Sequence, residues 1–93
     1  MYCLEFETEE DLYAVRDVIF YIVGTRGYIS KEEVLMVIGR HHEATHQDYK
    51  VGWDQAGKIV PPDETFTRWT LVFPEPSTIV STITYYLVKP KRK

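Results

Sequence analysis

Residues 66–88 read FTRWTLVF, PEPS and TIVSTITYYLV, two apolar stretches separated by a short segment with two prolines. In the first stretch Trp69, Leu71 and Phe73 are spaced two residues apart, so they would share one face of a β-strand. The second stretch, residues 78–88, carries no charge and is dense in Ile, Val, Thr and Tyr, which favours a strand. Because an exposed edge strand of this kind invites aggregation, we expect it to be central in its sheet or to pair across a homodimer.

Two shorter segments also have strand character. Tyr2, Leu4 and Phe6 alternate with Cys and Glu, which predicts a strand with one apolar face. Residues 58–60 are Lys-Ile-Val, and the Pro-Pro-Asp sequence at 61–63 is a turn signal directly after them. Four strands are therefore expected in the chain.

The region between these strands predicts two helices. Thr8 is a suitable N-cap for the first, and apolar residues recur three and four positions apart from Leu12 to Val23. A glycine favours the end of a helix, so Gly24 or Gly27 would stop it.

The second helix has a clearer start. The Ser30 hydroxyl can accept from the Glu33 amide while the Glu33 side chain reaches back, which is a capping box. The helix would end near Gly39, and the polar stretch 40–48 would form a short helix or an ordered loop. The resulting order, β-α-α-β-β-β, predicts an α+β fold with two helices packed on a small, mainly antiparallel sheet.

Composition limits the classes of function. The 93 residues, 44% of them hydrophobic, predict a single domain over residues 1–93 with a short basic tail at 89–93. A net charge of −3 argues against nucleic-acid binding as the dominant property, although the tail could contact nucleic acid weakly. The single cysteine, Cys3, the lack of a long apolar run and the acidic amino end predict a soluble cytoplasmic protein with no membrane association.

Residues 42–46 spell H-E-x-x-H, the zinc-metalloprotease signature. That chemistry needs a helix, because residues four apart on one face put two imidazoles on one metal. Gly39 precedes the motif and no third ligand stands at a familiar spacing, so we interpret the motif as coincidental and predict no enzyme, metal or cofactor. The alternative is a minimal zinc hydrolase with His42 and His46 as ligands and Glu43 as general base.

The element order is also compatible with a winged-helix DNA-binding regulator, in which residues 40–53 would form the recognition element. Such an element offers basic or amide side chains to phosphates and base edges. Arg40, Gln47 and Lys50 could serve, but acidic residues lie among them. This alternative also stays open.

Residues 26–34 and the sequence DYKVGWD at 48–54, with the LVFP sequence at 71–74, resemble small, mostly uncharacterised proteins of phages and prophages that carry a D-x-K-x-G-W motif after a capped helix. The resemblance covers about the central half of the chain. It does not extend to the first strand or to residues 78–88. Within the motif, Gly52 would allow a turn, and Trp53 would be either a core anchor or an exposed recognition residue.

The resemblance implies a phage or prophage accessory protein. Its small size, acidity and surplus of Tyr and Trp favour macromolecular binding, with a host or defence protein as the partner and an anti-CRISPR-like inhibitor as the sharpest version. A homodimer through the apolar strand, which begins at Thr78 and ends at Val88, is a further expectation. The candidate partner-binding residues are Arg40, His42, His46, Asp48, Lys50 and Trp53.

Overall fold

A computed structural model describes residues 1–78 of the chain. Its elements in order are β1 (Tyr2–Phe6), α1 (Glu9–Arg26), β2 (Ile29–Ser30), α2 (Lys31–Val37), the 3-10 turns η1 (His41–Glu43) and η2 (His46–Tyr49), β3 (Gly52–Trp53), β4 (Lys58–Val60) and β5 (Trp69–Phe73). Two helices with small antiparallel sheets confirm the predicted α+β class. In the described part, no helix has the length and apolar character needed to span a membrane.

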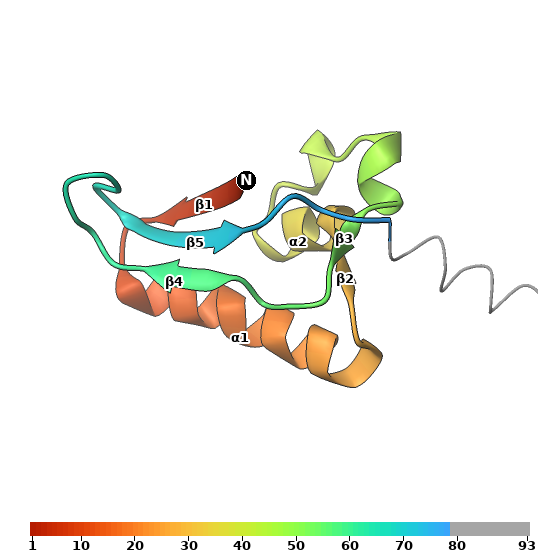
Figure 1. Cartoon of the computed structure of the whole chain (residues 1–93), viewed down its shortest axis with the longest axis horizontal. Coiled ribbons are helices and arrows are strands. Elements are labelled where there is room, and N and C mark those ends of the chain that lie inside the picture. The colour runs from red at the N-terminus through yellow and green to blue at the C-terminus, as the bar shows by residue number, and fades with distance from the viewer. Residues whose placement is uncertain (79–93) are drawn as a thin grey trace, which may run out of the picture.

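The larger sheet has the order β1-β5-β4, with β5 in the middle and both pairings antiparallel. Its register places Leu4 and Ile59 on either side of Leu71. Side chains at this level and two residues away point to one face, and α1 packs against that face (Figure 1). The predicted common face of Trp69, Leu71 and Phe73 is confirmed, because Leu71 and Phe73 are fully buried and Trp69 packs against the same core.

α1 has the ends that its sequence predicts. At the N-terminus of α1, the Thr8 hydroxyl accepts a hydrogen bond from the Asp11 amide at 3.1 Å. At its C-terminus, Gly27 has a left-handed backbone (φ +86°), and its amide donates a hydrogen bond to the Val23 carbonyl at 2.7 Å. Of the two predicted stops, Gly27 is the one used. The inner face of the helix buries Leu12 and Ile19 completely.

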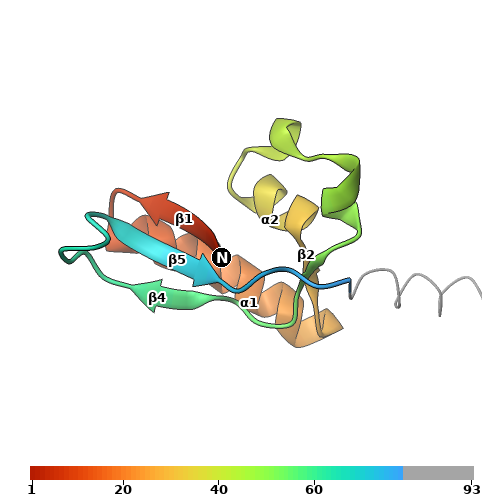
Figure 2. The same ribbon diagram turned by 45° about the horizontal axis from the view of Figure 1, so that its top comes forward.

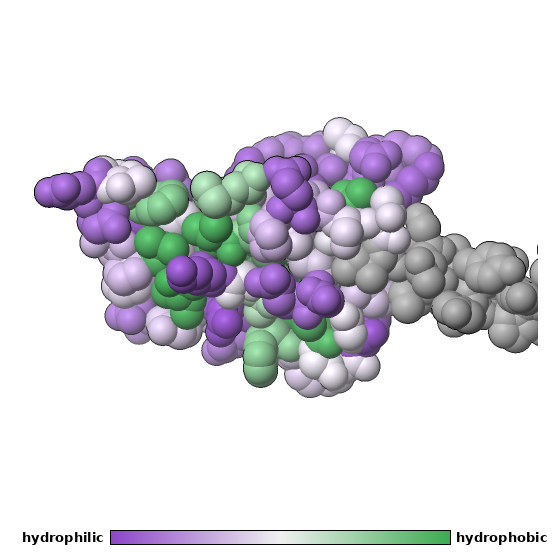
Figure 3. All heavy atoms as spheres, in the orientation of Figure 1, coloured by the Kyte–Doolittle hydropathy of each residue, from purple (hydrophilic) through white to green (hydrophobic). Residues whose placement is uncertain are grey.

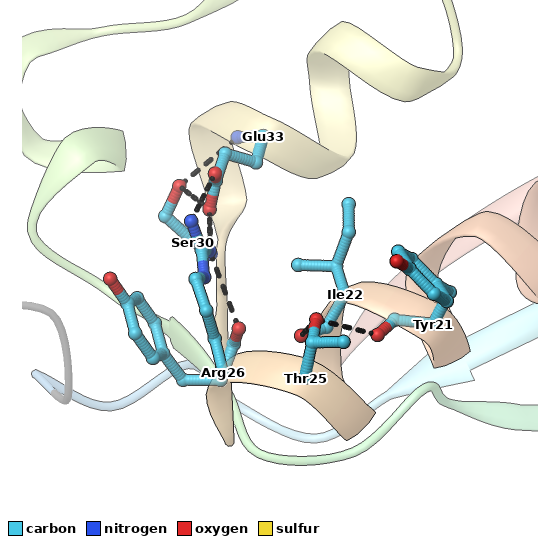
Figure 4. Close-up of polar contacts among 7 residues, drawn as sticks. Tyr21, Ile22, Thr25, Arg26, Ser30 and Glu33 are labelled. Carbon is cyan, nitrogen blue, oxygen red and sulfur yellow. Dashed lines mark hydrogen bonds and ion pairs between the residues drawn. The ribbon is translucent and has the colours of Figure 1, made fainter.

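α2 begins with the predicted capping box. The Ser30 hydroxyl accepts from the Glu33 amide at 3.1 Å, and the Glu33 carboxylate accepts from the Ser30 amide at 3.1 Å. Figure 4 shows Arg26 reaching the same carboxylate from the last turn of α1, with one of its two contacts at 2.8 Å. This arrangement joins the end of α1 to the start of α2, and Gly39 (φ +77°) follows the last turn of α2 as predicted.

A second sheet, β2 with β3, connects the helices to the main sheet. A Cβ placed on Gly52 would lie 2.0 Å from the Ile29 carbonyl oxygen, so only glycine allows this close approach of the two strands. The Trp53 ring stacks on the Tyr2 ring, with 5.5 Å between centroids, and lies tilted against the Phe73 ring, with 4.5 Å between centroids. Its Nε1–H donates to the Pro74 carbonyl at 2.7 Å. Gly52 and Trp53 therefore have a structural role in joining the two sheets.

Several predicted boundaries differ from the observed ones. The strand predicted over 66–73 begins only at Trp69, because the Asp63 carboxylate accepts from the Thr65 and Phe66 amides (2.8 and 2.7 Å) and holds those residues in a turn. The two-residue strands β2 and β3 were not predicted, since they are too short to show periodicity. Of the predicted strand 78–88, all but Thr78 lies outside the described residues.

Candidate functional site

The H-E-x-x-H sequence lies in two separate 3-10 turns and not in a helix. Ala44 and Thr45, between the turns, have extended backbones (φ −68°, ψ 136° and φ −104°, ψ 169°). His42 and His46 therefore lack the helical spacing that would place both imidazoles on one metal. Among residues 1–78, no three His, Cys, Asp or Glu side chains converge as a group that could hold a metal ion.

Glu43, the residue a hydrolase of this type would use as general base, is already bound. Arg40 donates to both of its carboxylate oxygens, from Nε at 2.7 Å and from Nη2 at 2.6 Å. These hydrogen bonds hold the pKa of the Glu43 carboxyl below its usual value. A general base works best with a pKa near the working pH, so the Arg40 contact moves Glu43 away from that role.

The 3-10 turns are attached to α2 by contacts between polar side chains. Glu32 is buried, and its carboxylate lies 2.7 Å from His41 Nε2. Asp48 is also buried: it accepts from the Thr45 amide at 2.9 Å and lies 3.6 Å from Lys31 Nζ. The polar side chains of this region thus hold the backbone in place.

This geometry corrects part of the predicted binding set. Trp53 is only 3% exposed and Asp48 only 7%, so neither can contact a partner in this structure. Of the two roles considered for Trp53, a core anchor or an exposed recognition residue, the structure shows the core anchor. Arg40, His42, His46 and Lys50 are exposed, but Arg40 is held by Glu43.

A recognition helix for DNA is absent from residues 40–53, which form 3-10 turns followed by β3. Of the Lys and Arg side chains in residues 26–53, Lys50 is exposed and forms no ion pair within residues 1–78. Arg26, Lys31 and Arg40 each pair with a carboxylate. The winged-helix interpretation therefore has neither its helix nor a set of unpaired cations in this region.

A different surface stands out on the face of α1 that points away from the sheet. Its exposed apolar and aromatic side chains are Tyr13, Val18, Phe20 and Tyr21, of which Phe20 is 62% and Tyr21 70% exposed. Residues seven or eight apart on a helix lie on the same side, so Tyr13 lies in line with Phe20 and Tyr21. We call these four residues the aromatic face of α1.

The aromatic face carries two exposed acidic groups, Glu10 in the first turn and Asp17 near the middle of the helix, and is bordered by one basic group. Asp17 lies between Tyr13 and Tyr21 by helical spacing, and it forms no ion pair within residues 1–78. The basic group is Arg16, whose side chain points toward the sheet side of the helix. Its Nε donates to the Gly57 carbonyl at 3.3 Å, and its guanidinium lies 5.9 Å from the Phe20 ring centre. The face is therefore aromatic with a negative centre.

Sequence reasoning missed this surface because the apolar residues of the first helix were treated as one stripe, without separating its two sides. Phe20 and Tyr21 fall within the apolar stretch from Leu12 to Val23, and the apolar character of that stretch does not by itself say which residues face the core. Plotting the helix at 100° per residue, with Leu12 and Ile19 as the inner side, places Tyr21 opposite the core and Phe20 at the flank, about 90° from the inner side.

No family model, curated protein or solved structure matches the chain.

Proposed function

We propose that this protein acts by binding another protein through the aromatic face of α1. The observation that carries the proposal is the exposure of Phe20 and Tyr21, with Tyr13 and Val18, on the outer side of a helix whose inner side is already packed. Contiguous exposed apolar side chains on a soluble surface are typical of interaction sites, and aromatic residues are frequent binding hot spots.

The partner that fits this face is an apolar surface with a basic side chain opposite Asp17. A second copy of the same helix fits less well. Asp17 lies near the middle of α1 (Glu9–Arg26), so an antiparallel two-fold pairing would place the two Asp17 carboxylates against each other. Like charges at the centre of an apolar interface oppose binding, which favours a different protein over a homodimer on this face.

Charge favours a protein partner over a nucleic acid. All 14 acidic residues of the chain but only seven of its 11 basic residues lie within residues 1–78, so this part carries a formal charge of −7. Phosphate backbones are bound by clustered Lys and Arg. A body with this charge and with Arg26, Lys31 and Arg40 already paired offers little to such a backbone.

The resemblance to small phage and prophage proteins adds the sharper proposal that the partner is a host or defence protein, which this chain would inhibit in the host cytoplasm. The resemblance is its only support. The proposal for the aromatic face stands on the contacts and exposures above and does not depend on it.

The test is affinity capture from a nuclease-treated bacterial lysate with three full-length baits. These are the wild type, the Phe20→Ser/Tyr21→Ser double variant, and the control Tyr49→Ser, which removes an exposed aromatic side chain from η2. We expect the wild type and the control to retain a stoichiometric partner. The double variant should retain at least about 30-fold less, since one hot-spot residue contributes 2 kcal/mol or more. Equal capture by all three baits would show that α1 is not the binding surface.

A further inference from the structure

The outer edge of β1 has no pairing strand in the described part of the chain. The main sheet has the order β1-β5-β4, and Figure 2 shows β1 at the upper margin of this sheet, above β5 and β4. Within residues 1–78, the backbone groups of β1 form hydrogen bonds with β5 alone. Alternate residues of an antiparallel strand direct their amide and carbonyl groups to opposite sides. Every second residue of β1 therefore directs both groups away from the sheet.

The other edge strand, β4, is less suited to accepting a neighbour. It has three residues, begins with Lys58 and is followed directly by Pro61 and Pro62. Short strands, lysines and prolines protect a sheet edge from the addition of further strands. β1 has five residues and contains neither lysine nor proline. Of the two edges, β1 is therefore the one at which another strand can be added.

A cavity of about 210 Å³ lies along the outer edge of β1. Its lining residues are Leu4, Glu5 and Phe6 of β1, with Ile38 and Arg40 from the end of α2. Successive residues of a strand point to opposite faces, so Leu4 and Glu5 can line one cavity only where it lies at the edge of the strand. In the described part of the chain, no β5 residue lines it, which places the cavity on the outer side of β1.

The size and the walls of the cavity suit one large apolar side chain. A cavity of about 150 Å³ is enough to hold benzene. Phe6 and Ile38 are half-buried and supply apolar walls. The charge of Arg40 is already matched, because its guanidinium donates to both carboxylate oxygens of Glu43.

The acidic side chains near this edge have no basic partner. Glu5 lies in β1 and Glu7 directly after it, and both are exposed. Neither forms an ion pair within residues 1–78. Opposite charges on neighbouring strands attract each other, so a strand beside β1 would gain from Lys or Arg at the positions next to these glutamates.

We propose that β1 accepts an extended segment of another protein as an additional strand of the main sheet. Backbone hydrogen bonds to β1 provide affinity, and alternate side chains provide specificity. An apolar side chain of the segment fills the cavity, and basic side chains lie beside Glu5 and Glu7. Figure 3 shows hydrophobic atoms gathered over the strands of the main sheet, the surface that the added strand extends. The segment therefore alternates basic and apolar residues.

A second copy of this chain fits the edge less well than such a segment. Its own β1 would bring Glu5 and Glu7 to the same edge, and no basic residue occurs in Tyr2–Phe6 to pair with them. The edge of β1 is also separate from the aromatic face of α1. The proposal for β1 is therefore independent of the function proposed for that face.

The test uses the full-length chain and the peptide acetyl-Lys-Val-Lys-Leu-Lys-Val-Lys-amide, with the same peptide carrying Glu in place of Lys as the charge control. Affinity is measured by isothermal titration calorimetry, and exchange of the β1 amides is followed by NMR. Two further peptides are N-methylated, one at every lysine and the other at every apolar residue. Since alternate amides of a strand point to the same side, only one of these two peptides should lose binding.

Three chains are compared: the wild type, Glu5→Lys/Glu7→Lys, and the control Asp54→Lys/Glu64→Lys, which changes the net charge equally at two exposed positions outside the cavity lining. We expect the Lys peptide to bind the wild type and the control with similar affinity. It should bind Glu5→Lys/Glu7→Lys at least about tenfold more weakly, and that variant should prefer the Glu peptide. Circular dichroism checks that each chain is folded.

In the wild type, saturating Lys peptide should slow exchange of the outward amides of β1 about tenfold. Absence of binding, or equal binding to the wild type and Glu5→Lys/Glu7→Lys, would overturn the proposal. Binding that both methylated peptides retain would exclude strand addition. Outward amides that are already protected without peptide would also overturn the proposal, because the edge would then be covered by this chain or by a second copy of it.

Discussion

The two halves of the described structure are held together by different forces. In the half formed by α1 and the main sheet, buried apolar side chains such as Leu12, Ile19 and Phe73 make the contacts. In the half formed by α2 and the two 3-10 turns, polar side-chain pairs such as Glu32–His41 and Lys31–Asp48 attach the turns to the helix. We call the half with α1 and the main sheet the apolar half, and the half with α2 and the 3-10 turns the polar half. Several charged side chains of the polar half hold the structure together, whereas the exposed aromatic face of α1 belongs to the apolar half.

The H-E-x-x-H motif lies in the half formed by α2 and the 3-10 turns. His42, Glu43 and His46 are side chains that can do chemistry, but Glu43 is bound by Arg40 and the two histidines lie in separate turns. On α1, by contrast, Phe20 and Tyr21 have no part in the core and are 62% and 70% exposed. The exposed aromatic pair is the more informative feature for function.

The largest effect is expected where the two halves meet, at Trp53. Trp53→Ala removes the ring that packs on Tyr2 and Phe73 and also the donor to the Pro74 carbonyl. We expect a loss of about 3–5 kcal/mol in the free energy of unfolding, measured by urea denaturation. A loss below about 1 kcal/mol would contradict the core role, because surface substitutions rarely cost more than about 0.5 kcal/mol.

The next largest loss of stability is expected for His41→Ala, which affects only the half formed by α2 and the 3-10 turns. His41→Ala leaves the buried Glu32 carboxylate without its partner, which should cost about 1–3 kcal/mol. Hydrogen exchange should show faster exchange of amides in residues 41–49, with α1 and β5 unchanged. Exchange that rises equally in all elements would show that the two halves are not energetically distinct. Glu32→Gln, alone and combined with His41→Ala, completes a double-mutant cycle that measures the coupling of the pair.

A smaller, pH-dependent effect is expected at the junction of the two helices. Burial raises the pKa of the Glu33 carboxyl, but hydrogen bonds from Arg26 and Ser30 outweigh it and hold the pKa below its usual value. The contribution of Glu33 to stability is therefore fully present above its unfolded-state pKa of about 4.3 and is lost as the pH falls through the lower folded-state pKa.

Glu33→Gln tests this sign, because glutamine can still complete the capping box but cannot form the ion pair with Arg26. Urea denaturation should show the variant less stable than the wild type at pH 7, with the difference shrinking steadily below about pH 4.3. The control Glu64→Gln, at an exposed position, should show no such trend. A difference for Glu33→Gln that is constant with pH would mean that the carboxylate charge does not contribute.

The helix ends and the main strands were predictable because their signals are local. Thr8 and Ser30 satisfy amides three residues away, and Leu71 and Phe73 follow a period of two, so short stretches of sequence specify these contacts. The contact between Gly52 and Ile29 could not be predicted, because it joins residues 23 positions apart in strands of two residues each.

The candidate site was harder to predict for a similar reason. The pairing of Glu32 with His41 depends on the turn of the chain after Gly39, and burial of a carboxylate leaves no mark in the sequence. The aromatic face of α1 was within reach, since the helix itself was correctly placed. Its outer residues were missed because their side of the helix was not separated from that of Leu12 and Ile19.

The smallest change in stability is expected at the H-E-x-x-H sequence, residues 42–46. His42 and His46 are exposed and lie in different turns, so His42→Ala and His46→Ala should each change the free energy of unfolding by no more than about 0.5 kcal/mol. Elemental analysis of the purified wild type should find zinc well below one ion per chain, and both variants should match it. One tightly held zinc per chain, lost in His42→Ala, would mean that the turns rearrange around a metal. The polar half would then be a reactive site, and its charged pairs would belong to the metal-free state alone.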